Sequence, residues 1–301
     1  MQKQIKFRKK RDLGAIITDT FSFYRNHAKS FFTVFFKHVG PLILLTTIVG
    51  SYIQKSTGNL LTLSGEDAQS GVSTDFFSSA FGQSFLTTSL VSVLLVILSI
   101  ATYTALISCV LYCIKSVLDD GEIIESHVVK NMRSKFFPIL GAVLVVSIVS
   151  AIGTLFFIIP GIYLFVTLSL IFSIMVFNHE PLTDAFSSCF TLIKQNWWMT
   201  FLTLIVIGLL VSFISSIFQV PMIILGLIEG FTAASQSGDI SMNYMGSWWY
   251  IIFYAISTIA SYVLMTISVI SSAYIYFNLD EFHNSTGQRE EIERIGGEEI
   301  S

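Results

Sequence analysis

Charged residues are scarce in this chain of 301 residues. They make up 12% of the sequence, whereas a typical soluble domain carries about 25%. Residues with apolar side chains make up 53%, and a folded soluble protein could not hide that much apolar surface from water. The scarcity of charge therefore excludes an ordinary soluble domain and predicts a protein that folds in a membrane.

Cysteine is also rare, with three residues in the chain. Cys109 and Cys113 are four residues apart on one expected helix, where their Cβ atoms would be about 6 Å apart and too distant for a disulfide. A disulfide framework is thereby excluded, and we expect the thiols to pack in the core.

The sequence contains no motif that identifies a chemical reaction. It lacks a Gly-x-Ser-x-Gly elbow, a glycine-rich phosphate loop and paired carboxylates inside an apolar segment. His179 and Glu180 could act as an acid–base pair, but Glu180 precedes Pro181 at an expected helix start, where the helix dipole favours an acidic residue. The histidines lie in separate segments without a metal-ligand spacing. We therefore expect no enzyme activity, no cofactor and no metal site. The five histidines are His27, His38, His127, His179 and His283.

Long apolar blocks recur between residues 31 and 278. A helix needs about 20 apolar residues to cross about 30 Å of hydrocarbon. The block from residue 136 to residue 178 would be roughly 65 Å long as one helix, so it must fold back, and Pro160-Gly161 is the turn signal near its middle. The sequence thus predicts an all-α, polytopic transmembrane helical bundle of six spans arranged as three hairpins. The predicted spans are residues 31–53, 85–114, 136–158, 162–177, 199–218 and 248–277.

Two of these spans carry polar residues or proline near one end. Lys37 and His38 lie inside the first span, where the Lys37 ammonium can extend toward the headgroups. Gln219 and Pro221 are predicted to close the fifth span. Residues 222–228 are too few to cross a membrane and are interpreted as an interfacial extension of that span.

Basic residues are distributed unevenly along the chain. With six spans, 16 of the 17 Lys and Arg residues fall on one side of the membrane and only Lys55 on the other. Because Lys and Arg are retained on the cytoplasmic face, both termini are predicted to be cytoplasmic. The basic cluster near the N-terminus is then a topology signal, not a nucleic-acid site. Charged residues interrupt the first apolar stretch, so no secretory signal is expected.

The charge pattern predicts three regions. Residues 1–30 form a basic cytoplasmic segment with an amphipathic helix, residues 31–278 the six-helix transmembrane domain, and residues 279–301 an acidic cytoplasmic tail.

A weak internal repeat accompanies this pattern. Basic or amide residues, then an aromatic pair, then a span occur at Arg25-Asn-His-Ala-Lys-Ser-Phe-Phe32, Asn131-Met-Arg-Ser-Lys-Phe-Phe137 and Lys194-Gln-Asn-Trp-Trp198. The repeat predicts that an amphipathic helix on the inner leaflet precedes each hairpin. The alternative is that any chain entering a bilayer tends to show basic residues followed by aromatics.

The clearest of these surface helices is predicted for residues 181–198. Pro181 suits a helix start, and the apolar residues that follow recur at helical spacing on one face. We expect this face to lie in the inner leaflet. The candidate lipid-interface residues are Leu182, Phe186, Phe190, Ile193, Trp197 and Trp198.

Several short motifs carry a resemblance to a known family. Ile159-Pro-Gly-Ile-Tyr-Leu164, Met175-Val-Phe177, Leu192-Ile-Lys-Gln-Asn-Trp-Trp198 and Arg11-Asp-Leu-Gly14 resemble bacterial six-span proteins related to the membrane domain of glycerophosphoryl diester phosphodiesterases. In fused relatives the hydrolase activity belongs to a separate barrel, a fold of about 250 residues, for which this sequence leaves no room. The resemblance implies a stand-alone, multi-pass protein of the bacterial inner membrane without that activity.

Two classes of function fit these features. The first is membrane organisation, lipid handling or a membrane-embedded scaffold, with membrane lipids as partners and Ser- and Gly-rich helix faces for protein partners or self-association. The alternative is a transporter or permease for a neutral or lipid-like solute. Coupled carriers usually bury an ionisable group in a span, and the predicted spans from Phe85 onward contain none. Ser257 and Ser261 repeat at a spacing typical of close helix packing.

Overall fold

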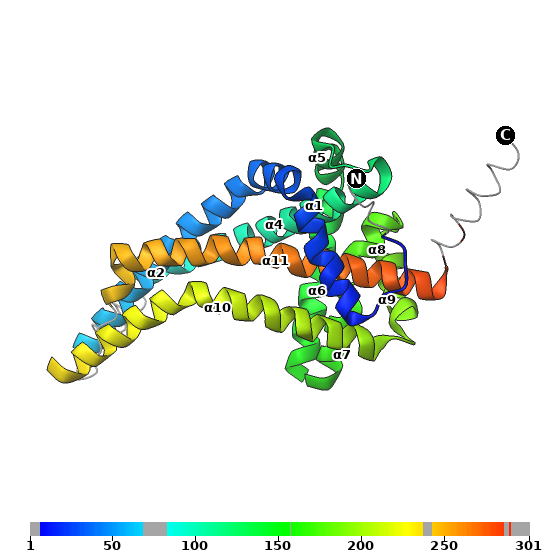
Figure 1. Ribbon diagram of the computed structural model, residues 1–301. Coiled ribbons are helices and arrows are strands. Elements are labelled where there is room, and N and C mark those ends of the chain that lie inside the picture. The colour runs from blue at the N-terminus through cyan, green and yellow to red at the C-terminus, as the bar shows by residue number, and fades with distance from the viewer. Residues whose placement is uncertain (1–6, 69–82, 157, 237–242, 286–288, 290–301) are drawn as a thin grey trace, which may run out of the picture. The chain divides into compact units, whose positions relative to one another are not determined.

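The computed structural model describes residues 7–68, 83–156, 158–236, 243–285 and 289. These residues fold almost entirely into helices, which confirms the all-α prediction. Residues 1–6 of the predicted basic segment, and residues 286–288 and 290–301 of the predicted acidic tail, lie outside the described part. The elements (Figure 1) are α1 (Leu13–His38), α2 (Gly40–Ala68), α4 (Gln83–Asp120), α5 (Glu125–Ser134), α6 (Phe136–Phe156), α7 (Ile158–Leu168), α8 (Ile171–Phe177), α9 (Leu182–Ile193), α10 (Trp197–Gln236), the 3-10 helix η1 (Asn243–Gly246) and α11 (Trp248–His283).

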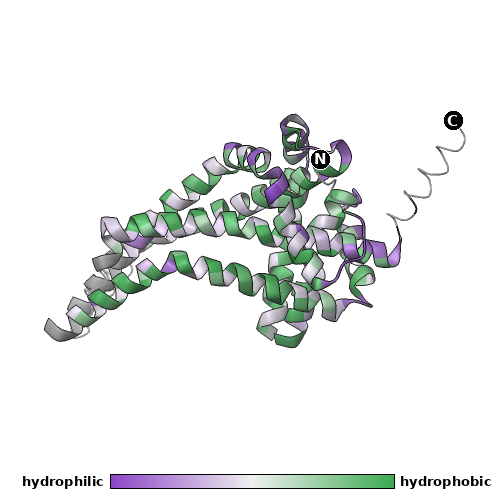
Figure 2. Ribbon diagram, viewed as in Figure 1, coloured by the Kyte–Doolittle hydropathy of each residue, from purple (hydrophilic) through white to green (hydrophobic). Residues whose placement is uncertain are grey.

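Among the described residues, five helical segments are long and apolar enough to cross a membrane, and a sixth arises if the bent pair α1 and α2 counts as one span. The chain is therefore a multi-pass membrane protein. Figure 2 shows the apolar character along α10, in contrast to the hydrophilic residues of α5 and of the end of α11. The five segments are Leu86–Asp120, Phe136–Leu155, Ile158–Phe177, Trp197–Thr232 and Trp248–His283, and each contains a predicted span or most of it.

The prediction of one continuous helix over residues 31–53 is wrong. Helix α1 continues without a break from Leu13 through the Phe31-Phe32 pair and ends at His38, and α2 begins at Gly40 after a bend. Pro41 explains the break, because it lacks an N–H and its ring clashes with the carbonyl four residues earlier. The repeat is affected too: the aromatic pair stands inside α1, whereas Phe136-Phe137 and Trp197-Trp198 begin α6 and α10.

The predicted turn at Pro160-Gly161 is also wrong in position. Both residues lie in the first turn of α7, which begins at Ile158, two residues after α6 ends at Phe156. Pro160 is tolerated there because the first N–H groups of a helix have no partner within it. Gly161 has a packing role: a Cβ at this position would lie 2.7 Å from Thr154 Cα on α6. Its missing side chain therefore lets α6 and α7 approach closely.

Pro221 does not close the fifth span. It lies inside α10, which runs from Trp197 to Gln236, so the residues interpreted as an interfacial extension continue the helix. A membrane helix can tolerate an internal proline when its neighbours satisfy the freed carbonyl. Apolar residues follow Pro221 directly, from Met222 to Ile228, and α10 continues through them despite the local break signal.

The chain divides into two units, and the boundaries fall inside α4, α10 and α11 and at the break between α1 and α2. Unit 1 comprises Met1–Val39, Tyr103–Val211 and Met265–Ser301, and unit 2 comprises Gly40–Thr102 and Ser212–Leu264.

In unit 1 the C-terminal half of α11 lies at the centre of the core. Figure 1 shows α1 lying across this half of α11, where Thr20 hydrogen-bonds Ser271 at 3.1 Å and Tyr24 hydrogen-bonds Thr266. The ring of Phe177, at the end of α8, packs 4.6 Å from that of Phe277. Residues 273–281 of α11 are buried without interruption, so this segment is surrounded on all sides.

Unit 2 is built from α2, η1 and parts of α4, α10 and α11. Thr46 and Thr102 join α2 to α4 by a hydroxyl hydrogen bond of 2.9 Å, and Ser56 and Thr88 repeat the arrangement at 2.6 Å. Gly50 on α2 leaves space for the Tyr254 ring of α11. Small and hydroxyl residues thus hold this unit together, as is common between helices in a membrane.

Candidate functional site

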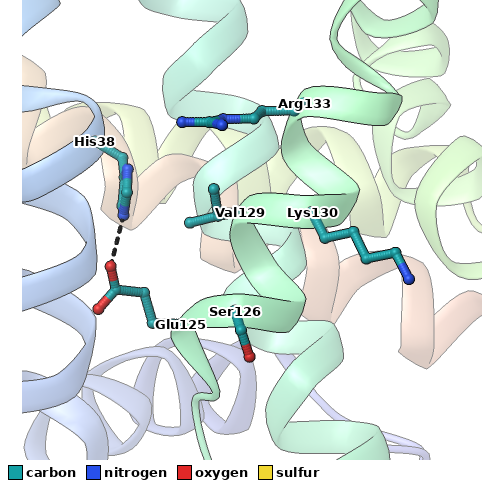
Figure 3. Close-up of a pocket in the computed structure, with 6 residues that line it drawn as sticks. All are labelled: His38, Glu125, Ser126, Val129, Lys130 and Arg133. Atoms are coloured by element: carbon teal, nitrogen blue, oxygen red, sulfur yellow. Dashed lines mark hydrogen bonds and ion pairs between the residues drawn. The ribbon is translucent and has the colours of Figure 1, made fainter.

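A basic pocket lies between the end of α1 and α5. It has a volume of about 740 Å³ and is open to the surroundings. The residues on α5 recur at helical spacing, so one face of this short helix forms the pocket wall. Figure 3 shows these side chains. The lining residues are His38, Glu125, Ser126, Val129, Lys130 and Arg133, and we call this site the α1–α5 pocket.

Glu125 links the two walls of the pocket. Its Oε1 lies 2.6 Å from Lys37 Nζ and 2.9 Å from His38 Nε2. Hydrogen bonds from Lys37 and His38 hold the pKa of the Glu125 carboxyl below its ordinary value. The carboxylate is therefore ionised at neutral pH and offsets the charge of α1 at this point, and it also favours the first turn of α5 through the helix dipole.

Two cations of the pocket are left without an acidic partner in the described part of the chain. Lys130 and Arg133 are both exposed, and neither forms an ion pair with a described carboxylate. In Figure 3 the Arg133 guanidinium points toward the side on which His38 lies, whereas the Lys130 ammonium points away from it. The pocket is consequently a positively charged concave surface with Arg133 directed across it.

A second polar cluster is centred on Arg11, which precedes α1 and is buried. Its backbone N–H donates to Asn278 Oδ1 at 2.6 Å, its Nε donates to Asp19 Oδ2 at 2.7 Å, and its Nη1 donates to the Phe7 carbonyl at 2.5 Å. The guanidinium also lies 4.8 Å from the centroid of the Tyr274 ring. These bonds satisfy most donors of Arg11 and attach the N-terminal segment to the end of α11, so this cluster has a structural role.

A third cluster surrounds His179, which has a left-handed backbone conformation with φ of 60°. Lys115 Nζ lies 2.6 Å from His179 Nε2 and 3.2 Å from the Val176 carbonyl oxygen. Desolvation, together with the nearby charges of Lys115 and Lys135, lowers the pKa of His179. The imidazole is therefore neutral at pH 7 and accepts a hydrogen bond from Lys115. His179 and Glu180 are not arranged as an acid–base pair, because Glu180 instead accepts from Asn178 and Ser188.

The helix predicted for residues 181–198 is shorter than expected. Helix α9 covers Leu182–Ile193 with Pro181 as its N-cap residue, and Trp197 and Trp198 begin α10. The side chains buried against the protein are those of Ala185, Cys189 and Ile193. Burial raises the pKa of the Cys189 thiol to about 12, so this thiol is unreactive at neutral pH.

The six candidate lipid-interface residues therefore do not form one surface. Ile193 is fully buried in the protein, so assigning it to the lipid interface is wrong. Trp197 stacks on Tyr163 and Phe201, with centroids 5.8 and 5.0 Å away. Phe190 lies 6.3 Å from Tyr163 and 5.4 Å from Phe186. Leu182, Phe186, Phe190 and Trp197 are half-buried, and Trp198 is 75% exposed.

Where the chain is described, no three His, Cys, Asp or Glu side chains come together as a metal site. His38 pairs with Glu125, and His127 lies 3.0 Å from Asp120.

Sequence reasoning did not find the α1–α5 pocket. The repeat predicted an amphipathic helix before the second hairpin, and α5 lies there, but no binding surface was assigned to it. The available signal was that Glu125, Val129 and Arg133 stand four residues apart and so share one face of that helix. The partner wall could not be found, because Lys37 and His38 are almost 90 residues away in the sequence.

The comparisons with known proteins assign the chain to no group: no family model, no curated protein and no solved structure matches it.

Proposed function

We propose that this protein handles or organises lipids as a multi-pass protein of the bacterial inner membrane, with both termini in the cytoplasm. The short motifs that resemble the membrane domain of glycerophosphoryl diester phosphodiesterases support the bacterial location. The distribution of Lys and Arg supports the orientation. With this orientation, α5 and α9 lie on the cytoplasmic side of the membrane.

The observation that carries the proposal is the pairing of two short helices with two exposed aromatic side chains. Helices α5 and α9 have 10 and 12 residues, too few to cross a membrane, and α6 and α10 follow them almost at once. Phe137 at the first junction is 77% exposed, and Trp198 at the second is 75% exposed. Aromatic side chains at such positions are typical of the membrane–water interface, which supports the proposal that both short helices contact headgroups.

The hydroxyl groups of unit 2 favour this function over transport of a neutral solute. Ser261 donates a hydrogen bond to a carbonyl of its own helix, and the hydroxyls of Thr46 and Thr102 lie within hydrogen-bond distance both of such carbonyls and of each other, so that one of them donates across the pair. Hydroxyls that are satisfied in this way act in helix packing. A transport pathway would instead need polar groups directed at the solute.

The test is to extract the full-length protein in mild detergent and identify the lipids that copurify. We expect anionic phospholipid to be enriched over its share of the source membrane. In liposomes the same protein should leave the permeability to small neutral solutes unchanged. A sample without lipid enrichment, or one with protein-dependent solute flux, would contradict the proposal and favour the transporter.

The orientation has a separate test. Reporter fusions after Asp120, Thr191 and Ser301 should report the cytoplasm, and fusions after Ser70 and Ser237 should report the outside. Ser70, Ser237 and Ser301 lie outside the described residues, so these fusions test the sequence pattern alone. A cytoplasmic signal at Ser237 would remove the six-span topology.

A further inference from the structure

We propose that the α1–α5 pocket binds the phosphodiester of an anionic phospholipid, an inference that rests on the proposed function and gives it a defined site. Arg133 is the principal ligand, Lys130 adds charge at the rim, His38 forms the opposite wall, and Lys37 is paired with Glu125 beside it.

The charges of the pocket favour an anion. Glu125 is already shared between Lys37 and His38 at 2.6 and 2.9 Å, so it holds these two groups in place. Arg133 and Lys130 add two further positive charges, for which the described chain supplies no carboxylate. A phosphate is the ligand that matches Arg133 best, because the planar guanidinium can donate two parallel hydrogen bonds to phosphate oxygens.

The position of the pocket in the chain favours a lipid phosphate over a free one. Arg133 is three residues before α6 begins at Phe136, and Phe137 is 77% exposed. On the other wall, Phe36 is 47% exposed and directly precedes Lys37. Exposed aromatics next to both walls place the pocket at the depth of the lipid headgroups. Basic pockets beside membrane helices are known sites for anionic headgroups.

The size of the pocket is compatible with this ligand. Its volume of about 740 Å³ is in the range of sites that hold small molecules, which is roughly 300 to 1,000 Å³. Its openness suits a headgroup that stays attached to acyl chains, because the chains must leave the pocket toward the hydrocarbon.

The experiment measures lipid binding to the full-length protein in mild detergent by native mass spectrometry. The probes are phosphatidylglycerol, zwitterionic phosphatidylcholine and millimolar inorganic phosphate as competitor. The variant is Lys130→Gln with Arg133→Gln. The matched control is Arg25→Gln with Lys29→Gln, which removes the same two charges from α1 in the same unit. Circular dichroism establishes that both variants are folded.

We expect the wild type and the control to bind phosphatidylglycerol more tightly than phosphatidylcholine. The pocket variant should bind phosphatidylglycerol about tenfold to thirtyfold more weakly, because each cation near a membrane surface contributes on the order of 1 kcal/mol. The single variant Arg133→Lys should show a smaller loss, because the lysine ammonium keeps the charge but cannot donate two parallel hydrogen bonds to the phosphate.

Other outcomes overturn the inference in distinguishable ways. Equal weakening in the control would show general attraction to the basic end of the chain. Displacement of phosphatidylglycerol by inorganic phosphate would show a site for free phosphate. Unchanged binding in the pocket variant would remove the site but leave the proposed function standing. If the wild type retained no anionic lipid, the proposed function itself would fail.

Discussion

The two halves of α4 have the same kind of sequence and very different surroundings. In unit 1, residues 104–114 are buried on every side of the helix. In unit 2, Leu90, Val93, Leu94, Val96 and Ile97 are more than half exposed. Hydropathy cannot distinguish the halves, because lipid tails are as apolar as a protein core. The unit 1 half of α4 therefore belongs to a protein core, whereas the exposed apolar side chains of the unit 2 half suit contact with the bilayer.

The two units also differ in their polar contacts. Unit 1 contains a buried guanidinium and side chains that bond across more than 90 residues of sequence, such as Tyr276 to Asn178 at 2.5 Å and Ser272 to the Ser169 carbonyl at 2.9 Å. Unit 2 contains mainly hydroxyls bonded to hydroxyls or to their own helix. Losing a charged partner in a buried site costs more than losing a hydroxyl. We therefore expect single substitutions to destabilise unit 1 more than unit 2.

The largest effect is expected for Arg11→Ala. The substitution leaves Asp19 with the more exposed Lys9, at 2.9 Å, and removes the donors to the Phe7 and Lys9 carbonyls. Breaking a buried ion pair typically destabilises a protein by about 3 kcal/mol. Thermal unfolding in detergent micelles, followed by circular dichroism, should show a clear loss. Arg25→Ala, elsewhere on α1, should change stability by less than about 0.5 kcal/mol. Equal melting of the two variants would contradict a structural role for the Arg11 cluster.

A smaller effect is expected from adding one methyl group at the close helix contacts. In Gly161→Ala the new Cβ meets backbone atoms of Thr154 at 2.7 Å, which cannot move without shifting α6. Overpacking of this kind destabilises by about 1–3 kcal/mol. In Gly50→Ala of unit 2 the new Cβ meets only the end of the Tyr254 side chain, which can rotate. Gly161→Ala should therefore lower the melting temperature more than Gly50→Ala.

The chain offers a matched control in each unit for this pair. At Gly141 in α6 and Gly230 in α10, an added methyl group would meet no neighbouring atom within 4 Å. Alanine at either position should be neutral or should stabilise the protein by about 0.5–1 kcal/mol, because alanine has less conformational freedom than glycine in the unfolded chain. If Gly141→Ala were as harmful as Gly161→Ala, the close contact of α6 and α7 would not be the cause.

The sequence allowed the helix content and most spans to be predicted, because a span depends on a local run of apolar residues. The positions of helix breaks at prolines were predicted wrongly, because the effect of a proline depends on the structure that surrounds it. Pro41, Pro160 and Pro221 are each in an apolar run, yet Pro41 follows a helix break, Pro160 lies in a first turn and Pro221 lies inside α10. The α1–α5 pocket and the Arg11 cluster could not be predicted, because each joins segments far apart in sequence through side-chain contacts.

A still smaller effect is expected from the hydroxyl pair of unit 2. Thr46→Val and Thr102→Val each remove one member of a hydrogen bond of 2.9 Å between α2 and α4, while keeping the shape of the side chain. Hydrogen bonds between membrane helices contribute about 0.6 kcal/mol on average. A double-mutant cycle measured by thermal unfolding should give a coupling energy of about this size. A coupling above about 2 kcal/mol would show that unit 2 depends on polar contacts as strongly as unit 1 does.

The smallest effect concerns the pH dependence of unit 1 at His179. Its folded-state pKa is lowered from the ordinary value of 6.5 by desolvation and by the charges of Lys115 and Lys135, while Asp119 acts in the opposite sense. The unfolded state therefore binds a proton more readily than the folded state. As the pH falls below about 6.5, this difference reduces stability, and the loss stops growing below the folded pKa. Because His179 is exposed, solvent screening keeps the change small.

Asn at this position tolerates a positive φ, so His179→Asn should fold normally and melt with a weaker dependence on pH between about 7.5 and 5. Identical pH profiles for the variant and the wild type would show that protonation of His179 does not act on the stability of unit 1.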